Sequence, residues 1–400
     1  MIQDLPLAGK RVLIRVDFNV PLNKDGSIAD DSRIRESIPT IQHALKSGAG
    51  VVLMSHMGRP KSKQEVQYSL GICAKRLSQL ISAPVMFVSD CIGKDVEKQV
   101  QELKSGQVLV LENLRYYPAE ENPSSDLNFA KELAKFGDFY VNDAFAAAHR
   151  SHASISVIDQ HFSGKAAMGF LMQKEVSFLE SLLNHPQHPF HVLVGGAKVS
   201  TKIGVLKSIL KKVDALYVGG GMAFTFLKAQ GVEIGDSIVE ETAIQEAAEL
   251  LKTCTEQGIP LYLPIDLVIA DGFRNDAIFK TIDVQSGIPE GWVGMDMGPK
   301  TVQNWGLGLK EAATVFWNGP FGVFEFSHFS RGTQEMAKML ASLSATTIVG
   351  GGDSVAAINQ LHLADKFTHV STGGGASLEY LELGHLPGID ALSDKYTGHQ

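Results

Sequence analysis

The stretch RVLIRVDFNV (residues 11–20) joins a short apolar run to a polar turn, and this pattern recurs along the chain. A run rich in Val, Ile and Leu is typical of a strand that is buried on both faces of a sheet. Four more runs follow in the first half of the chain: VVLM (51–54), VMFV (85–88), VLVL (108–111) and FYV (139–141). Between them, stretches such as 38–46 and 70–81 have apolar residues three and four positions apart, as in a helix. Strands that alternate with helices predict a doubly wound α/β domain around a parallel sheet.

The same pattern begins again after residue 190. Its runs are HVLV (191–194), LYV (216–218), DLVIA (266–270), TVFW (314–317), TIV (347–349) and HV (369–370). Between the two series, apolar residues at helical spacing predict a connecting helix: Met172, Val176, Leu179 and Leu183. Asn184, Pro186 and Pro189 end it. Because no Ser/Gly-rich linker is present, we expect two doubly wound α/β domains joined by this helix, with any relative motion at a hinge.

Composition excludes several classes of protein. The 400 residues are 44% hydrophobic and 20% charged, which predicts two or three globular domains. The formal charge of −8 argues against nucleic acid as a partner, because a protein that binds nucleic acid must neutralise many phosphates. No signal peptide or apolar membrane span is expected, and three dispersed cysteines fit the reducing cytoplasm better than a disulfide framework.

The arginines are concentrated in the first part of the chain. Residues 1–170 contain eight of the ten arginines and 20 Lys and Arg against 19 Asp and Glu, whereas the remainder has 16 against 25. Arginine binds carboxylates and phosphates in a bidentate manner. The first half is therefore expected to bind a small anion.

Polar residues follow several strands of the first series, where ligands bind in open α/β sheets. They comprise Asp17, Phe18 and Asn19 after the first strand, Arg33 a little later, His56, Met57, Gly58 and Arg59 in SHMGRP, Arg115 in ENLR, and His149, Arg150 and His152 in NDAFAAAHRSH. Each arginine alone also fits a surface salt bridge. Their repetition at successive strand ends favours one crevice for a ligand with a phosphate, a carboxylate and a hydroxyl. The histidines lack metal-binding spacing.

Glycine clusters follow strands of the second series: GGAKVSTK (195–202), GGGM (219–222), GGGDS (350–354) and STGGG (371–375). A helix reached through glycines presents free N–H groups to an anion. Asp353 fits two roles there, capping the helix or holding a divalent ion. With Lys198 and Lys202 at the same edge, the pattern favours nucleotide phosphates. Glu325 fits either a ribose contact or an ordinary loop carboxylate.

Familiar catalytic motifs are absent. The sequence contains no GxxxxGK[ST], GxGxxG, GxSxG, HRD or DFG string. These absences argue against a P-loop enzyme, a protein kinase, an α/β-hydrolase and a nicotinamide dehydrogenase. A two-lobed binding protein that closes on a phosphorylated ligand would explain the arginines but not the lysines and glycine turns.

Eight strings in order resemble the phosphoglycerate kinase family, from about residue 5 to about residue 390: RVDFNVP, SHMGRP, ENLR, GGAKVSTK, VGGGMAFTF, WNGPFGVFE, GGGDS and STGGGASLE. The resemblance implies Rossmann-like domains. Residues 1–170 with the returning segment 388–400 would bind 3-phosphoglycerate or 1,3-bisphosphoglycerate, and residues 171–387 would bind ADP or ATP with Mg²⁺. It also implies a cytoplasmic monomer with small-molecule partners, no membrane partner, and a hinge region at Ser371 and Thr372.

Site residues are carried over from the family by position. Asp17 and Asn19 would bind the glycerate hydroxyl and carboxylate side, and the anionic groups would be held by Arg33, His56, Arg59, Arg115 and Arg150. Phe18, Met57 and Gly58 belong to the same site. The nucleotide site would comprise Gly196, Ala197, Lys198, Lys202, Gly220, Asn318, Glu325 as ribose ligand, Gly351, Gly352, Asp353 as magnesium ligand, and Ser354. Leu383, Gly384 and His385 depart from the family pattern, and Ser151 stands where Ala is common.

The implied reaction needs no general base, because a carboxylate and a phosphate oxygen are both ionised at neutral pH. Catalysis then rests on positioning and positive potential. We expect Arg33, Lys202 and the N–H groups of Gly351 and Gly352 to supply that potential once the lobes close.

Overall fold

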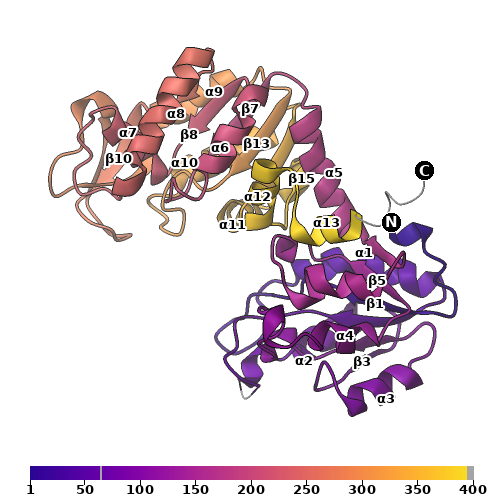
Figure 1. Cartoon of the computed structure of the whole chain (residues 1–400). Helices are drawn as coiled ribbons and strands as arrows, with labels where there is room; N and C mark the ends of the chain where they lie inside the picture. The colour runs from indigo at the N-terminus through magenta and orange to yellow at the C-terminus, as the bar shows by residue number, and fades with distance from the viewer. Residues whose placement is uncertain (64, 394–400) are drawn as a thin grey trace. The chain divides into compact units, whose positions relative to one another are not determined.

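The computed structural model describes residues 1–63 and 65–393, in two compact units (Figure 1). Unit 1 contains Met1–Ser177 and the chain from His385 onward, and unit 2 contains Phe178–Gly384. The connecting helix is α5 (Phe170–Asn184), so the division falls within it. Residues 394–400 of the expected returning segment lie outside the described residues.

Unit 1 is built on a six-stranded parallel sheet. In spatial order its strands are β3 (Val85–Phe87), β4 (Val108–Val110), β2 (Gly50–Met54), β1 (Arg11–Arg15), β5 (Phe139–Asn142) and β6 (Ala166–Met168). The expected doubly wound α/β class is confirmed. The first five strands follow the predicted apolar runs, whereas β6 was not predicted.

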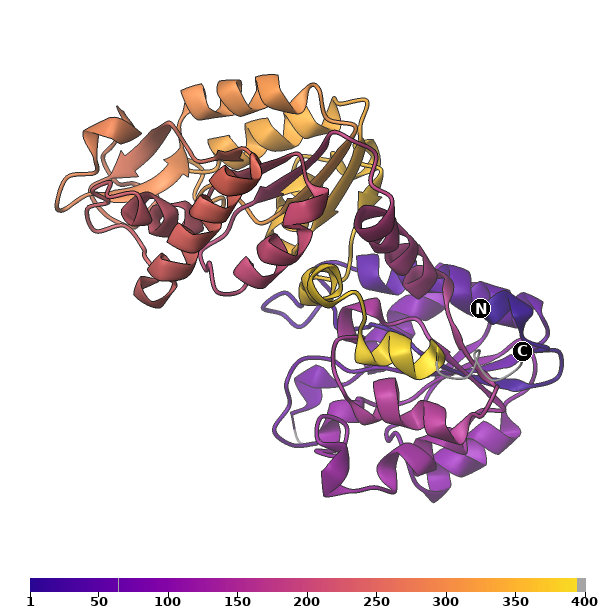
Figure 2. The same ribbon diagram turned by 45° about the horizontal axis from the view of Figure 1, so that its top comes forward.

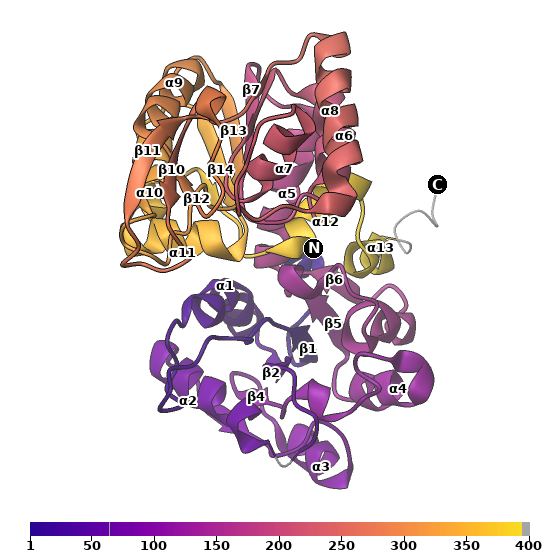
Figure 3. The same cartoon turned by 90° about the vertical axis from the view of Figure 1, so that its left-hand side faces the viewer.

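Alternate residues of these strands enter two separate cores. Val12 and Ile14 of β1 pack on the face covered by α1 (Ser32–Lys46) and α2 (Gly71–Leu80). Leu13 packs on the opposite face, which α3 (Lys94–Glu102) and α4 (Phe129–Ala134) cover (Figure 3). Because both faces are buried, the strands are apolar throughout, and polar residues collect where the strands end.

Unit 2 contains a second six-stranded parallel sheet. Its strands in spatial order are β15 (His369–Val370), β14 (Thr346–Gly350), β13 (Thr314–Asn318), β7 (Phe190–Val194), β8 (Ala215–Val218) and β9 (Leu261–Tyr262). The helices are α6 (Ile203–Ile209), α7 (Met222–Ala229), α8 (Ile244–Gln257), α9 (Pro299–Leu309), α10 (Arg331–Ala341), α11 (Gly352–Gln360) and α12 (Gly375–Leu383). Figure 3 shows α9 and α10 on one side of this sheet and α6 and α8 on the other.

The run DLVIA does not join this parallel sheet. It forms β10 (Asp266–Ala270), the centre of a three-stranded antiparallel sheet with β11 (Phe279–Asp283) and β12 (Val293–Met297). The expectation of one continuous series of parallel strands is therefore wrong at this point. An apolar run indicates that a strand is buried, but it does not indicate whether the neighbouring strand is parallel or antiparallel.

The chain returns to unit 1 after α12. Gly384 ends α12 in the left-handed conformation, with φ of +77°. The last described helix, α13 (Pro387–Ser393), then packs on unit 1, where the Gly388 N–H donates to the Ala148 carbonyl at 2.8 Å (Figure 2). Among the described residues, no helix is both long enough and apolar enough to cross a membrane.

Candidate active site

Hydrogen bonds join the loops that follow β1, β2 and β4 of unit 1. Arg33 donates to one carboxylate oxygen of Asp17, and the other oxygen accepts from the Asn19 N–H at 3.1 Å. The Asn19 side-chain oxygen accepts from the Gly58 N–H at 2.8 Å, and the Gly58 carbonyl accepts from Arg115 Nη1 at 2.8 Å. The structure therefore brings these five predicted residues together at one edge of the sheet.

Asn113 supports this edge and was not singled out from the sequence. Its amide nitrogen donates to the carbonyls of Met57 and Tyr68 at 2.7 and 2.8 Å, and its oxygen accepts from the Met57 N–H at 3.2 Å. Gly58 has φ of +60°, and a Cβ there would overlap the Tyr68 ring. The only sequence signal for Asn113 is its place in ENLR.

Positive charges surround two buried histidines. Burial is the main cause that lowers the pKa of His56 well below its ordinary value, and Arg15, Arg115 and Arg33 act in the same direction. For His152, burial followed by Arg15, Arg115 and Arg150 lowers the pKa to about 3. Both rings are therefore neutral at pH 7. Their shared arginine neighbours show that these side chains gather around one place.

Arg115 is itself affected by this crowding. Burial lowers its pKa, and Arg15 and Arg59 act in the same direction, opposed by Glu121, whose carboxylate lies 3.1 Å away. Arg59 and Arg150 are exposed to solvent. Several positive charges close together repel one another and raise the free energy of the unliganded protein. Because an anion would offset this repulsion, this edge is suited to an anionic ligand.

Two predicted residues do not present their side chains at this edge. Phe18 is fully buried and Met57 is 1% exposed, and both belong to the core between the sheet and helices α1 and α2. Only their backbone groups remain for a ligand.

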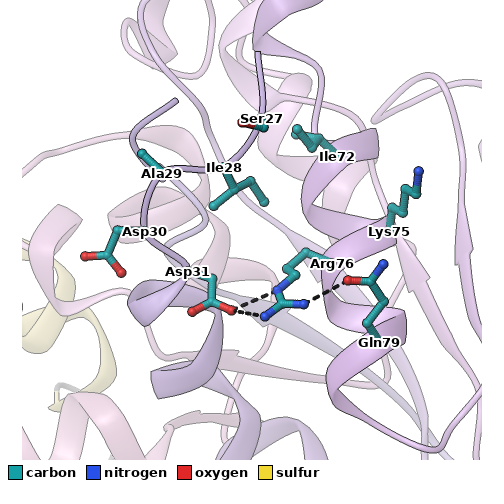
Figure 4. Close-up of a pocket in the computed structure, with 9 residues that line it drawn as sticks. All are labelled: Ser27, Ile28, Ala29, Asp30, Asp31, Ile72, Lys75, Arg76 and Gln79. Carbon is teal, nitrogen blue, oxygen red and sulfur yellow. Dashed lines mark hydrogen bonds and ion pairs between the residues drawn. The ribbon is translucent and has the colours of Figure 1, made fainter. Parts of the chain in front are cut away.

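A pocket of about 560 Å³ in unit 1 lies away from these residues. Figure 4 shows it between the loop of Ser27 to Asp31 and helix α2. Its arginine, Arg76, is bound to Asp31 at 2.7 Å and donates to Gln79 at 2.8 Å. Because this charge is already neutralised, the pocket is not a strong anion site.

Unit 2 contains a pocket of about 530 Å³ at the ends of its strands. Five predicted residues line it: Gly196, Ala197, Gly220, Glu325 and Asp353. Apolar side chains from the antiparallel sheet and its neighbours form another part of the wall, among them Ile238, Leu267, Phe273, Met295 and Phe321. This apolar wall was not predicted from the sequence, although β10 was expected to be a strand. A largely apolar pocket with a few polar groups is typical of a small-molecule site.

The N-terminus of α11 has no side-chain cap. Gly351 is the cap residue, with φ of +90°, and Asp353 lies exposed in the first turn without capping the helix. The capping role considered for Asp353 is therefore not adopted. Ser354 is buried, and its hydroxyl accepts from the Gly319 N–H at 2.6 Å, so this side chain stabilises a neighbouring loop.

Asn318 lies beside this helix start. It is 2% exposed, and its amide nitrogen has no hydrogen-bond partner within residues 1–63 and 65–393. A Cβ placed on Gly351 would lie 3.1 Å from that nitrogen. A buried hydrogen-bond donor without a partner lowers the free energy of unfolding. It therefore indicates a place for an acceptor supplied by a ligand.

Lys202 completes this group. Its ammonium is buried at the ends of adjacent strands β7 and β13, where it donates to the carbonyls of Gly195 and Asn318, the latter at 3.0 Å. Burial lowers the pKa of Lys202 to about 8, and the Asp353 carboxylate opposes this effect. Lys198 is exposed, and neither lysine lines the 530 Å³ pocket. Within the described chain, no cluster of three or more His, Cys, Asp or Glu residues is arranged to hold a metal.

Comparison with known proteins covers almost the whole chain. The family described as Phosphoglycerate kinase matches residues 2–384. The phosphoglycerate kinase of Synechococcus elongatus is 49% identical over 391 residues, which is 97% of this chain and 96% of the relative. The cytosolic phosphoglycerate kinase of Nicotiana tabacum is 50% identical over 396 residues, 98% of both chains.

A solved structure also matches almost the whole chain. The phosphoglycerate kinase from Coxiella burnetii has a TM-score of 0.86 and 38% identity, and the match covers 99% of each chain. The resemblance seen in the sequence motifs is thereby confirmed. The chain belongs to the phosphoglycerate kinase family and is a phosphotransferase.

Proposed function

We propose that unit 1 binds the phosphoglycerate and unit 2 binds the nucleotide in the reaction of this family. That reaction is the reversible transfer of a phosphoryl group from 1,3-bisphosphoglycerate to ADP, which gives 3-phosphoglycerate and ATP in glycolysis and gluconeogenesis. Its substrates are small molecules.

The observation that carries the nucleotide assignment is the start of α11, which has no side-chain cap, beside the Asn318 amide nitrogen, for which the described part of the chain offers no hydrogen-bond partner. Free N–H groups at a helix N-terminus attract phosphate, and the helix dipole adds to the attraction. The adjacent pocket has an apolar wall suited to a purine and a carboxylate, Glu325, suited to ribose hydroxyls. We assign Gly196, Ala197, Gly220 and Lys198 to the same site.

Unit 1 provides complementary groups for a phosphorylated hydroxy acid. Arg33, Arg59, Arg115 and Arg150 supply positive charge, and His56 supplies a neutral ring. The Asp17 carboxylate has lone pairs beyond those used by Arg33 and Asn19, so it is suited to accept from the glycerate hydroxyl. Asn19 and the backbone at Phe18, Met57 and Gly58 complete the proposed site.

The chemistry requires no proton acceptor, because the nucleophile in each direction, a phosphate oxygen of ADP or the carboxylate of 3-phosphoglycerate, is already ionised at pH 7. In a loose transition state, charge spreads over the three equatorial oxygens of the transferred group. We assign their stabilisation to Arg33, to the Lys202 ammonium and to the N–H groups of Gly351 and Gly352. Removal of one such donor costs roughly 100- to 1,000-fold in turnover in other enzymes.

Asp353 is the residue suited to Mg²⁺. Its carboxylate is exposed beside the proposed phosphate site, and Mg²⁺ in nucleotide sites commonly takes one or two carboxylates together with phosphate oxygens. A single carboxylate therefore fits an ion that arrives with the nucleotide, whose chemistry is to neutralise phosphate charge. We further propose a cytoplasmic monomer that binds neither membrane nor nucleic acid, in line with the net charge of −8.

The first test replaces Arg33 with alanine. We expect ATP formation from 1,3-bisphosphoglycerate and ADP, measured in a coupled assay, to fall at least 100-fold. Calorimetry should give unchanged ADP affinity, because Arg33 belongs to unit 1. Turnover at the wild-type rate would refute the role of Arg33.

The second test replaces Asp353 with alanine. Affinity for ATP in the presence of Mg²⁺ should fall, whereas affinity for 3-phosphoglycerate should stay at the wild-type value. Titration with ATP in EDTA is the control, because the difference between the two proteins should shrink when Mg²⁺ is removed. Equal losses for both ligands would contradict the division of ligands between the units.

A further inference from the structure

Arg15, the last residue of β1, is buried completely beneath the proposed phosphoglycerate site. Its position in the β1 strand directs the side chain to the face of the sheet that also holds Leu13. An arginine with no exposed surface cannot reach a ligand in solvent as Arg59 or Arg150 can. Its effect on the site must pass through the groups that it contacts.

All three nitrogen atoms of the Arg15 guanidinium take part in these contacts. Nε donates to the Ser154 hydroxyl at 2.8 Å, Nη1 donates to the Val16 carbonyl, and Nη2 lies 3.0 Å from His56 Nδ1. The carboxylate of Glu120, which is also fully buried, lies 3.8 Å from Nη2.

Ser154 and Glu120 hold this arrangement in place. The Ser154 hydroxyl donates to Glu120 at 2.6 Å, and the Ser154 N–H donates to the other carboxylate oxygen at 3.0 Å. The Tyr140 hydroxyl donates to the Ser154 carbonyl at 2.8 Å. A planar guanidinium bound on several sides has one available orientation.

This orientation determines the protonation of His56. A guanidinium has five N–H donors and no acceptor, so the Nδ1 atom that faces it must accept. The ring proton is then on Nε2. A doubly protonated ring would direct the Nδ1 hydrogen at a permanent positive charge.

We propose that Arg15 is a positioning residue that holds His56 as the Nε2–H tautomer, so that the ring acts as a hydrogen-bond donor to the anionic substrate. This inference rests on the proposed binding of phosphoglycerate to unit 1. Two other groups near His56, Arg33 and Arg115, are positive and act in the same direction, whereas His152 is a neutral ring at pH 7. The nearby carboxylate of Glu120 is engaged by Ser154 as well as by Arg15.

Nitrogen NMR of the ¹⁵N-histidine-labelled protein reports the tautomer directly. In the unliganded wild-type protein at pH 7, we expect His56 Nδ1 to show the shift of an unprotonated nitrogen and Nε2 that of a protonated one. The pattern should persist at pH 5.5, because burial and Arg15 lower the pKa of His56. A ring with its proton on Nδ1, or on both nitrogens, would overturn the inference whatever the variants do.

Arg15→Lys tests the positioning role. Lysine keeps the charge opposite Glu120, but a single ammonium cannot replace all the contacts of the guanidinium. We expect a mixed-tautomer spectrum and a KM for 3-phosphoglycerate about 10- to 100-fold higher, the loss associated with one hydrogen bond to a charged group. KM for ATP should be unchanged. Arg76→Lys is the matched control, because Arg76 is bound to Asp31 outside the site (Figure 4).

Each result has a distinct meaning. Arg15→Lys with a wild-type spectrum, or with an altered spectrum and a wild-type KM for 3-phosphoglycerate, would overturn the positioning role. If Arg15→Lys does not fold, Ser154→Ala, which removes the acceptor of Arg15 Nε, should show the same two changes to a smaller extent. Failure of the proposed function would look different: a wild-type protein with the Nε2–H ring that forms no ATP.

Discussion

Lys202 shows how the fold changes the chemistry of a single residue. Its type and its position after a strand were recognisable in the sequence, and they predicted a phosphate ligand. Its burial between the carbonyls of Gly195 and Asn318 could not be predicted, because Asn318 comes from a strand more than one hundred residues later. The same applies to Arg15, one of the eight arginines of residues 1–170. It was not among the predicted site residues, and the structure buries it beside Glu120.

The lowered pKa of Lys202 predicts a pH dependence. Only the protonated ammonium stabilises a phosphoryl group, and with a pKa of about 8 the charged fraction declines as pH rises through 8. We therefore expect kcat/KM for the nucleotide to fall above pH 8, since this ratio reports ionisation of the free enzyme.

Lys202→Arg provides the control for this titration. Arginine stays charged throughout, so the variant should have lower activity at pH 7 but no decline between pH 8 and 9.5. A decline at the same pH in both proteins would assign the titration to another group.

At the scale of elements, the apolar runs predicted the strands well because each run fills a buried position in a sheet. Strands β6 and β9 escaped prediction because β6 (AAM) contains no Val, Ile or Leu and β9 (LY) lies between Pro260 and Pro264. Strands β11 and β12 contain exposed or half-buried residues, so they also lack an apolar run. In the candidate site, the strand ends revealed the polar residues, whereas the apolar wall of the pocket depends on an antiparallel sheet that was not expected.

The start of helix α11 allows a matched pair of glycine substitutions. At Gly351, φ of +90° disfavours any side chain, and a Cβ would lie 3.1 Å from the Asn318 amide. Gly351→Ala should therefore lose about 1–3 kcal/mol in the free energy of unfolding. At Gly352 no atom lies within 4 Å of an added Cβ, so Gly352→Ala should keep wild-type stability.

Urea denaturation followed by circular dichroism measures both effects. Calorimetry should show weaker ADP binding for Gly352→Ala despite its stability, because the added methyl group lies where we place the phosphates. Equal stability of Gly351→Ala and the wild-type protein would show that the left-handed conformation is not required there.

At the scale of the whole molecule, each unit has its own sheet and its own cores, and the two were recognisable as two series of strands. The alternatives considered from the sequence, a nicotinamide dehydrogenase and a closing binding protein, are not supported by the family match over residues 2–384. The sequence did not reveal that the division falls within α5, because the periodicity of this helix continues without interruption.

Amide hydrogen exchange tests the assignment of one ligand to each unit. We expect saturating ADP with Mg²⁺ to slow exchange at the start of α11 and around Gly196 and Gly220. Exchange throughout unit 1 should keep the rates of the unliganded protein. A bound ligand stabilises the folded form of the unit that holds it, by about 2.7 kcal/mol at one hundred times Kd. 3-Phosphoglycerate should protect the loops of Asn19, Gly58 and Arg115 instead. Protection of the same unit by both ligands would contradict the assignment.

The return of the chain through α13 has a consequence for biosynthesis. Leu392 enters a core that also contains Leu13, and Gly388 packs so closely that a Cβ there would lie 2.7 Å from Ile155. Residues from the two ends of the polypeptide thus complete a single core. On the ribosome, unit 2 emerges as one uninterrupted segment, whereas unit 1 receives residues 387–393, the last contribution to its core, only after the whole of unit 2 has been translated.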